Sequence, residues 1–451
     1  MEKVQALQEE ARELLEQRRY HQLKNILAGA LPPDIVEIIQ DLEVSEQVIL
    51  FRLLSKETAA EVFSLLNHEE QEELLEHFSR DAVKGIIEEM DPDDRAELFE
   101  ELPDAMVRRL IRLLSPEDRS VLNQLLNYPE DSAGRLMTPE LIKIERDLTA
   151  QQAIDRIRRT GINKETIYYS YVVDEQETLI GAVSLRQLLF ADPGTPVEEL
   201  MTTNLVYVNT HEDQEEVARI LSRYDLSALP VVDHQQKLVG IITIDDVVDV
   251  IEEEATEDFH KMAGMGATEA PYFATGFFLL GRKRALWLVV LLVTSYLSSI
   301  VLKHYSPVLE IVIPLAFFIP MLTGTCGNSG MQSATLIIRG LAVGEVVLQD
   351  VFRILAREIL MGAFLGVVLG GFAYLRALFL EVNPLVGVSV GLAVLISVIT
   401  ANTIGSMLPL ILKKLRIDPA ISAGPFISTI IDVTTLLLYF EIAKLLFGIS
   451  P

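Results

Sequence analysis

A single aspartate, Asp432, lies near the middle of the apolar stretch Ile421–Phe447, the last of five such stretches in the C-terminal third of the chain. A stretch of this length can cross a lipid bilayer, and a carboxylate at that depth costs several kcal/mol unless it faces water, a partner or an ion. A second carboxylate, Asp418, lies just before the same stretch, at its cytosolic end. Two carboxylates along one path suit a cation. The structural alternative is that Asp432 hydrogen-bonds a neighbouring helix.

The five apolar stretches are candidate membrane spans: Ala285–Leu302, Val308–Ile338, Ile354–Leu380, Leu385–Leu412 and Ile421–Phe447. The second is too long for one straight span. We expect the small and polar run Gly324–Thr335 to interrupt it and to line an aqueous path with Asn328 and Gln332. Glycines at four-residue spacing in the third stretch predict close helix packing instead: Gly362, Gly366, Gly370 and Gly371.

Basic residues flank these stretches unevenly, with nine at the junctions on one side and three on the other. Because positive charge is retained on the cytoplasmic side, the N-terminus is predicted inside and the C-terminus outside. The segment Met1–Tyr20 is charged and has no apolar core, so no cleavable signal peptide is expected. We therefore predict a multi-pass protein of the plasma (inner) membrane whose first two thirds are cytosolic.

The cytosolic part is strongly acidic. The whole chain carries a net charge of −27, and because twelve basic and eight acidic residues follow residue 270, the first 270 residues carry −31. This charge density repels nucleic acid and anionic lipid, and it favours cations. Solvation of helical faces explains part of the excess, and a multivalent cation ligand is the other interpretation. The single cysteine and seven scattered histidines show no zinc-ligand spacing, and no catalytic constellation converges, so an enzyme is not expected.

A strict twelve-residue period runs through residues 31 to 127. Apolar residues recur at Leu42, Leu54, Leu66, Phe78, Met90, Leu102, Leu114 and Leu126, each preceded four positions earlier by another apolar residue. Cap residues such as Ser55 and Asn67 follow, and residues four apart share a helical face. Each unit is therefore predicted to be one short helix stacked on the next. The result would be an α-superhelical domain over residues 1–130 that acts as a scaffold or lever.

Residues 131–251 contain two related halves. Leu136-Met137-Thr138 recurs as Leu200-Met201-Thr202, and Tyr171-Val172-Val173-Asp174 is echoed by Pro230-Val231-Val232-Asp233. Each half is predicted to fold as strand, helix, strand, turn, strand, helix. The segment resembles a tandem pair of cystathionine-β-synthase-type (CBS) domains, an α/β regulatory module whose members often bind adenine nucleotides or ions.

An acidic segment, Asp245–Asp258, follows and is predicted to be a helix that runs towards the first span. Acids on adjacent turns, Asp246 with Asp249 and Glu253 with Glu257, repel one another unless something neutralises them. A solvated linker is the simpler interpretation, and a gate beneath a pore is the other. We assign residues 252–270 to this linker helix and residues 271–451 to a five-span transmembrane domain.

Over essentially its whole length the chain resembles the MgtE family of magnesium channels. The resemblance rests on the order of the parts and on three motifs, Tyr128–Pro139, Gly327–Leu336 and Asp432–Thr434. It implies a Mg²⁺-selective channel or transporter that imports magnesium as a homodimer in the lipid bilayer. Its pore would lie on the two-fold axis, lined by the second and fifth spans, with Asp432 of each subunit facing the ion. Departures from the family pattern occur at Met331, Gly424 and Thr435.

The resemblance also implies that Mg²⁺ bound between the cytosolic domains and the linker helix holds the channel shut. The family's regulatory carboxylates would fall on Glu61, Asp93, Glu97, Asp213, Glu215, Asp225, Asp246, Asp249, Glu254, Glu257 and Asp258. Family members can also hold ATP as a regulator in the paired CBS domains. The matching residues are Tyr169 for adenine stacking, Arg186 and Asp246 for polar contacts, and Thr243 near the phosphates, while Gln187 replaces an acid expected at the ribose.

Two other classes stay open at this point. A secondary divalent-cation transporter (Mg²⁺/Co²⁺) would usually show an inverted repeat, and five spans offer none within a subunit. A membrane-anchored ion or nucleotide sensor would explain the cytosolic domains, but it would not explain Asp432 or the polar second span. The expected fold is a multidomain α-helical membrane protein with an α-superhelical N-terminal domain, tandem CBS domains, a linker helix and five transmembrane helices.

Overall fold

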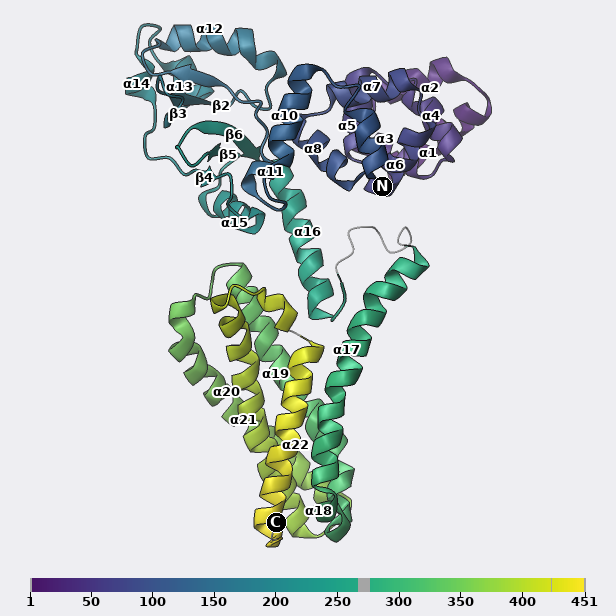
Figure 1. Ribbon diagram of the computed structural model, residues 1–451, viewed down its shortest axis with the longest axis vertical. Helices are drawn as coiled ribbons and strands as arrows, with labels where there is room; N and C mark the ends of the chain where they lie inside the picture. The colour runs from purple at the N-terminus through teal and green to yellow at the C-terminus, as the bar shows by residue number, and fades with distance from the viewer. Residues whose placement is uncertain (1, 267–275, 423, 450–451) are drawn as a thin grey trace. The chain divides into compact units, whose positions relative to one another are not determined.

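The computed structural model describes residues 2–266, 276–422 and 424–449 (Figure 1). It consists of two compact units, Met1–Glu252 and Glu253–Pro451. The first unit contains short helices followed by two small sheets, and the second contains long helices. The domain boundary expected after residue 270 lies outside the described residues.

Short helices open the first unit, and from residue 32 onward they follow the twelve-residue period. The side chain of Ser55 accepts a hydrogen bond from Thr58 N at 3.1 Å, and Asn67 Oδ1 accepts one from Glu70 N at 3.0 Å, so cap residues fix where these helices begin. One helix per repeat is thereby confirmed. The helices are α1 (Glu2–Glu16), α2 (Tyr20–Leu27), α3 (Pro32–Gln40), α4 (Val44–Phe51), α5 (Lys56–Ser64), α6 (His68–His77), α7 (Arg80–Glu89), α8 (Pro92–Glu101), α9 (Asp104–Leu110) and α10 (Pro116–Leu126).

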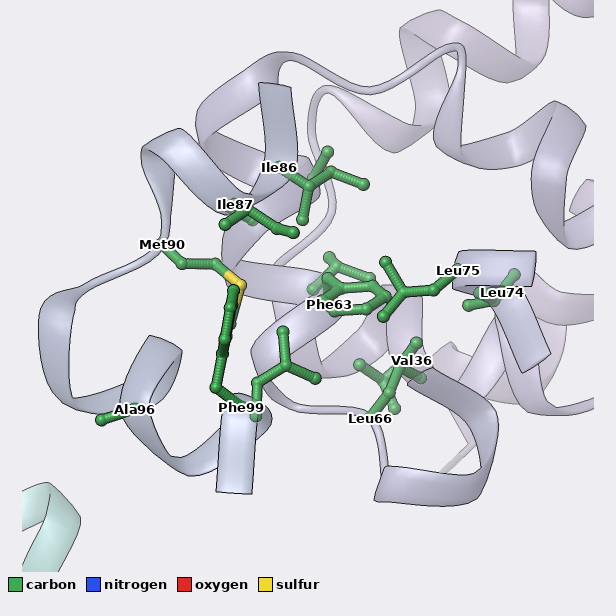
Figure 2. Packing of buried hydrophobic residues seen from close by; sticks show 14 of the residues in the cluster. Val36, Phe63, Leu66, Leu74, Leu75, Ile86, Ile87, Met90, Ala96 and Phe99 are labelled. Atoms are coloured by element: carbon green, nitrogen blue, oxygen red, sulfur yellow. The ribbon is translucent and has the colours of Figure 1, made fainter. Parts of the chain in front are cut away.

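The two apolar positions of each repeat have different roles. The first lies within its helix and is buried, as Leu74 is in α6, whereas the second lies at or beyond the helix end, as Phe78 does. The prediction that both share one helical face is therefore wrong for most repeats, because the helices are too short to contain both. Figure 2 shows the resulting core around Phe63. The rings of Phe51 and Phe78 meet edge to face there at 5.1 Å.

Two three-stranded sheets of the same topology form the CBS pair, with strand orders β1-β2-β3 and β4-β5-β6. In each sheet a parallel pair is followed by an antiparallel pair, which confirms the predicted order of elements. The elements are α11 (Ala133–Leu136), β1 (Lys143–Glu145), α12 (Ala150–Thr160), β2 (Tyr169–Val173), β3 (Leu179–Ser184), α13 (Leu185–Phe190), α14 (Val197–Leu200), β4 (Val208–Asn209), α15 (Gln214–Tyr224), β5 (Ala228–Val232), β6 (Leu238–Thr243) and α16 (Ile244–Met262).

The two halves exchange their Leu-Met-Thr motifs. Thr138 of the first motif exchanges backbone hydrogen bonds of 2.8 and 2.9 Å with Ile241 in the second sheet. Thr202 of the second motif does the same with Ala182 in the first sheet, at 2.9 and 3.0 Å. Each motif thus completes the sheet of the other half, and the repeats cannot separate without breaking both pairs.

Long helices dominate the second unit, where α17, α20 and α21 are long and apolar enough to cross a membrane. Their length and composition agree with three of the five predicted spans, and the count of five stays a prediction. The unit contains α17 (Phe277–His304), α18 (Ser306–Ile311), α19 (Ile319–Ala342), α20 (Val351–Phe379), α21 (Pro384–Lys414) and α22 (Pro425–Phe447), with 3₁₀ turns at Ile313–Phe318, Leu348–Asp350 and Pro419–Ser422.

Helix α21 is the centre of this bundle and packs against α19, α20 and α22. Glycines of α20 allow close approach: a Cβ atom on Gly362 would lie 2.8 Å from Ile399 Cα, and one on Gly370 would lie 2.6 Å from Gly391 O. The predicted glycine packing is therefore confirmed for Gly362, Gly366 and Gly370, whereas Gly371 has open space beside it.

The polar run Gly324–Thr335 does not interrupt a span, contrary to expectation. Helix α19 is continuous through it, and the irregular backbone lies earlier, at Ile313–Phe318. Unpaired backbone groups are costly in hydrocarbon, so the run stays helical and only its side chains are polar.

The segments that flank the pore domain also differ in part from expectation. Helix α16 ends at Met262, so the assigned linker 252–270 is not one helix. Helix α22 begins at Pro425, after Gly424 in a left-handed conformation with φ of 65°. The proline therefore breaks the predicted fifth stretch and starts a new helix.

Candidate ion sites

Asp432 lies on α22 and faces α19. A Cβ atom on Gly327 of α19 would lie 3.8 Å from Asp432 Oδ1 and 3.7 Å from the Oγ of Ser428, one turn earlier on α22. The carboxylate is half-buried, and no described residue hydrogen-bonds or pairs with it. A hydrogen bond to a neighbouring helix, the structural alternative, is therefore not made within the described residues.

Helix α19 presents a polar face beside this carboxylate. Asn328 and Gln332, one turn apart, are exposed in the single subunit, whereas Cys326, Ser329 and Ser333 are buried against the bundle. Amide side chains in a membrane helix are costly on a lipid-facing surface. The face that carries them is thus expected to line water or to contact another protein surface.

Asp418, at the start of the last span, belongs to a mixed cluster of charges. The Nζ atom of Lys261 lies 2.6 Å from Asp418 Oδ2 and 2.6 Å from Glu257 Oε2. Burial, with repulsion from Asp418, raises the pKa of Asp258 to about 6. Burial alone would lower the pKa of Lys261, but hydrogen bonds with Asp418 and Glu257 outweigh it and raise the pKa to about 12. The cluster joins the C-terminal end of α16 to the segment before α22.

A second acidic cluster lies in the first unit. It combines Asp91, Asp93 and Asp94 at the start of α8, Glu165 in the loop before β2, and Asp245 and Asp246 at the start of α16. The Oδ1 atom of Asp93 is buried without a hydrogen-bond donor among the described residues, while Asp246 Oδ2 accepts a hydrogen bond of 2.7 Å from Thr243 Oγ1. Three segments far apart in sequence therefore bring carboxylates together.

Burial and mutual repulsion disfavour the charged forms of these acids. Burial, with repulsion from Asp91, raises the pKa of Asp94 to about 6 and that of Glu165 to about 7. Burial, partly opposed by the Thr243 hydrogen bond, raises the pKa of Asp246 to about 6. Burial, with repulsion from Asp246, raises the pKa of Asp93 well above its usual range. A cation placed here would offset this repulsion.

The other predicted regulatory acids do not join one site. Asp213 caps α15 through a 3.0 Å hydrogen bond from Glu215 N, and Asp225 lies beyond the opposite end of that helix with φ of 50°. Glu61 is exposed on α5, and Glu97 lies 3.8 Å from His68. Glu254 and Asp249 lie on α16 at the edges of the two clusters, where Glu254 repels Asp258 and Asp249 repels Asp246. Among the described residues, no three acidic, histidine or cysteine side chains have the geometry to hold one metal ion.

Comparisons with known proteins show to which family this chain belongs. The MgtE model, described as divalent cation transporter, matches residues 319–442, the MgtE intracellular N domain matches residues 30–131, and the CBS domain matches residues 133–194 and 197–253. The magnesium transporter MgtE of Thermus thermophilus is 45% identical over 322 residues, 71% of each chain. That of Bacillus subtilis is 37% identical over 319 residues, 71% of this chain and 70% of the relative. The chain belongs to the MgtE family.

Two solved structures of the soluble parts of magnesium transport proteins are similar to this chain. The cytosolic domain of the Mg²⁺ channel MgtE in complex with ATP has a TM-score of 0.52 and 41% identity, covering 53% of this chain and 98% of that one. The soluble part of a magnesium transporter has a TM-score of 0.53 and 28% identity, covering 56% and 99%. Membership in the MgtE family confirms a membrane transport protein rather than an enzyme.

The residues suggested for ATP fall into two equivalent places of the CBS pair. Tyr169 and Arg186 are exposed near the paired ends of β2 and β3. Thr243 is buried and donates to Asp246, just as Ser184 Oγ donates to Gln187 Oε1 at 2.8 Å in the other half. Gln187 also donates to Leu200 O at 3.1 Å. Tyr169 and Arg186 are thus open to solvent, whereas Gln187 is already engaged in local hydrogen bonds.

Sequence reasoning missed Asp91, Asp94 and Glu165 of the first acidic cluster, and Lys261 of the second. Asp91 lies at the N-cap position of α8, yet its side chain makes no capping hydrogen bond. The doublet Asp93-Asp94 after a proline was the available signal. No local signal identifies Glu165, because its proximity to α8 and α16 depends on how the MgtE N domain packs on the CBS pair.

Proposed function

We propose that this protein is a Mg²⁺-selective channel that imports magnesium as a homodimer and is closed by cytosolic Mg²⁺. The observation that carries this proposal is the unpartnered carboxylate of Asp432 facing α19, beside the exposed amides of Asn328 and Gln332. The relatives named magnesium transporter support magnesium as the cargo.

The exposed polar face of α19 supports the homodimer. Its side chains need water or protein beside them, and one subunit supplies neither. A second copy related by a two-fold axis would place α19 and α22 of both subunits around a central path. The two symmetry-related Asp432 carboxylates would then face one ion.

The chemistry of Mg²⁺ suits this arrangement. The ion dehydrates reluctantly and keeps an octahedral water shell. Paired carboxylates and the amides of Asn328 and Gln332 can hydrogen-bond those waters without removing them. Binding then stays weak enough for release, which conduction requires. Asp418 would attract the ion at the cytosolic end, although Lys261 pairs with it in this structure.

Regulation would use the two acidic clusters. The first unites Asp93, Asp94, Glu165 and Asp246, and the second unites Glu257, Asp258 and Asp418. At low magnesium their repulsion favours looser arrangements, and at high magnesium bound ions stabilise the closed one. Closure requires only that the closed state binds the ions more tightly. The remaining acids, Asp213, Glu215 and Asp225 among them, would contribute weaker surface sites.

ATP is the proposed second regulator of the CBS pair. Tyr169 would stack on the base, Arg186 and Asp246 would make polar contacts, and Thr243 would lie near the phosphates. The protein would be a multi-pass protein of the inner membrane, with its N-terminus in the cytoplasm and its C-terminus outside. The three apolar helices and the basic residues at the span junctions support this orientation.

The test is Asp432→Asn in purified protein reconstituted into planar bilayers. We expect the wild type to give single-channel Mg²⁺ currents and the variant to lose Mg²⁺ selectivity by about tenfold or more, because the ring of charge is removed and packing is kept. Glu345→Gln, in the exposed connection after α19, is the matched control and should leave selectivity unchanged. Flux without resolvable current steps would favour a carrier, and unchanged selectivity in Asp432→Asn would refute the pore assignment.

A further inference from the structure

Two serine hydroxyls of α19 make the short polar contacts that hold this helix in the bundle. Ser329 Oγ lies 2.6 Å from Asn402 Oδ1 on α21, and Ser333 Oγ lies 2.6 Å from Glu358 Oε2 on α20. Ser329, Ser333 and Asn402 are only 6%, 4% and 2% exposed. We call these two hydrogen bonds the serine seam.

The serine seam has a fixed angular relation to the pore-facing side chains. Consecutive residues of an α-helix are rotated by about 100°, and residues four apart lie on one face. Asn328 immediately precedes Ser329, and Gln332 immediately precedes Ser333. The two amide side chains therefore form a row parallel to the two serines, about 100° around the helix. Gly327, which faces Asp432, immediately precedes Asn328 and therefore lies a further rotation of about 100° around the axis of α19. A rotation of α19 would therefore move all of these groups together.

Apolar packing brings the helices together without defining the rotation as strictly. A Cβ atom on Gly330 would lie 2.9 Å from Ala401 O, so the backbones of α19 and α21 are in close contact there. The side chain of Ile431 on α22 packs against the same glycine, and apolar contacts of this kind are non-directional. A hydrogen bond is directional and weakens steeply when its angle changes. The serine seam supplies this directional restraint on α19.

Glu358 is an unusual residue for a purely structural role. It is the eighth residue of the 29-residue apolar helix α20, and it accepts its hydrogen bond from the serine of another helix. An ionisable side chain in a membrane helix is costly and is retained mainly where it serves function. An ionised carboxylate can only accept, which fixes Ser333 as the donor.

We propose that the serine seam, through Ser333–Glu358 and Ser329–Asn402, positions α19 so that Asn328 and Gln332 face the ion path, and thereby sets ion selectivity. The proposal rests on the pore function proposed above. Glu358, Ser333, Ser329 and Asn402 are positioning residues, since none of them contacts the ion. They act by restricting the rotation of the helix that does.

The test compares Ser333→Ala and Glu358→Leu, which each remove one partner, with Glu358→Gln, which keeps an acceptor oxygen. Full-length protein in planar bilayers should show a loss of Mg²⁺-over-Ca²⁺ selectivity of about tenfold in the first two, and selectivity within about twofold of wild type in Glu358→Gln. Ser389→Ala is the matched control, because Ser389 is fully buried in α21 and its hydroxyl has no hydrogen-bond partner in the part of the chain that the structure describes. It should leave selectivity unchanged.

A second measurement needs no ion current. Gln332→Cys should react with a water-soluble thiol reagent, against a low background because Cys326 is buried. Adding Ser333→Ala should change this reactivity by about threefold or more if the helix rotates, at an unchanged thermal midpoint. Unchanged reactivity and selectivity in Ser333→Ala and Glu358→Leu, with Asp432→Asn still unselective, would overturn the serine seam alone. Full selectivity in Asp432→Asn would instead overturn the proposed pore. The thiol reactivity of Gln332→Cys would then still decide whether the serine seam fixes the rotation of α19.

Discussion

The ammonium group of Lys261 lies 2.6 Å from the Oδ2 atom of Asp418, between the end of α16 and the segment that leads into α22. The same ammonium group contacts Glu257, and Asp258 is close enough to repel Asp418. A covalently attached cation thus lies among the carboxylates that a divalent ion would use. Lys261 and Mg²⁺ are expected to compete for them.

Replacing Lys261 by methionine should make closure more sensitive to magnesium. Removal of one positive charge leaves Glu257, Asp258 and Asp418 uncompensated, so the site should bind Mg²⁺ more tightly. We expect half-closure at a Mg²⁺ concentration about tenfold lower, which corresponds to about 1.4 kcal/mol. Channel open probability against cytosolic Mg²⁺ measures this, with Lys261→Arg as the charge-retaining control. A shift to higher concentration would mean that Lys261 itself holds the closed state.

The first acidic cluster should make stability depend on pH in an unusual direction. The pKa values of Asp94, Asp246 and Glu165 are raised to about 6, 6 and 7, so between about pH 4 and pH 7 the folded state holds protons that the unfolded chain has released. The free energy of unfolding therefore falls as pH rises through this window.

For the metal-free protein we accordingly expect a thermal midpoint a few degrees higher at about pH 6 than at about pH 8. Saturating Mg²⁺ should abolish the difference, because the ion replaces the protons, whereas sodium chloride at matched ionic strength should leave most of it. The triple variant Asp94→Asn, Glu165→Gln, Asp246→Asn should show a flat profile. A midpoint that rises with pH in the metal-free wild type would contradict the cluster.

The exchanged Leu-Met-Thr motifs should be sensitive to a single methyl group. A Cβ atom on Gly181 would lie 2.6 Å from Met201 Sδ, a distance that side chains cannot occupy without shifting. Gly181→Ala should therefore lower the free energy of unfolding by about 1–3 kcal/mol. Gly194→Ala, with open space beside it, should be close to neutral. Chemical denaturation of the full chain would show the contrast, and equal effects of the two changes would argue against the packing of Met201 on Gly181.

Local sequence rules determined the helical repeats well. Ser55, Asn67, Ser79 and Ser115 each cap the helix that follows, as the twelve-residue period predicts. The repeated Val-Val-Asp turns were equally predictable, because Asp174 and Asp233 each accept two hydrogen bonds from the backbone of their own turn. Interactions that close within a few residues are encoded by those residues.

Long-range features could not be derived in the same way. The exchange of Thr138 and Thr202 between the sheets, and the approach of Glu165 to Asp94, each join segments tens of residues apart. The continuous helix through Gly324–Thr335 shows a different limit. Glycine and serine favour turns in water, but in a bilayer the cost of unpaired backbone groups reverses that preference.

Helix α17 differs from its neighbours in how little of it is covered. Only 6% of its most apolar 18 residues are buried, compared with 50% in α21. A helix that needs so few protein contacts can enter the lipid as soon as it leaves the ribosome, with Arg282, Lys283 and Arg284 held back on the near side. Helix α21, with its buried Asn402 and Pro409, needs its neighbours to hide those groups. Because the chain is synthesised from its N-terminus, α17 enters the membrane first. Helix α21 follows only after α19 and α20, against which it packs, are already present.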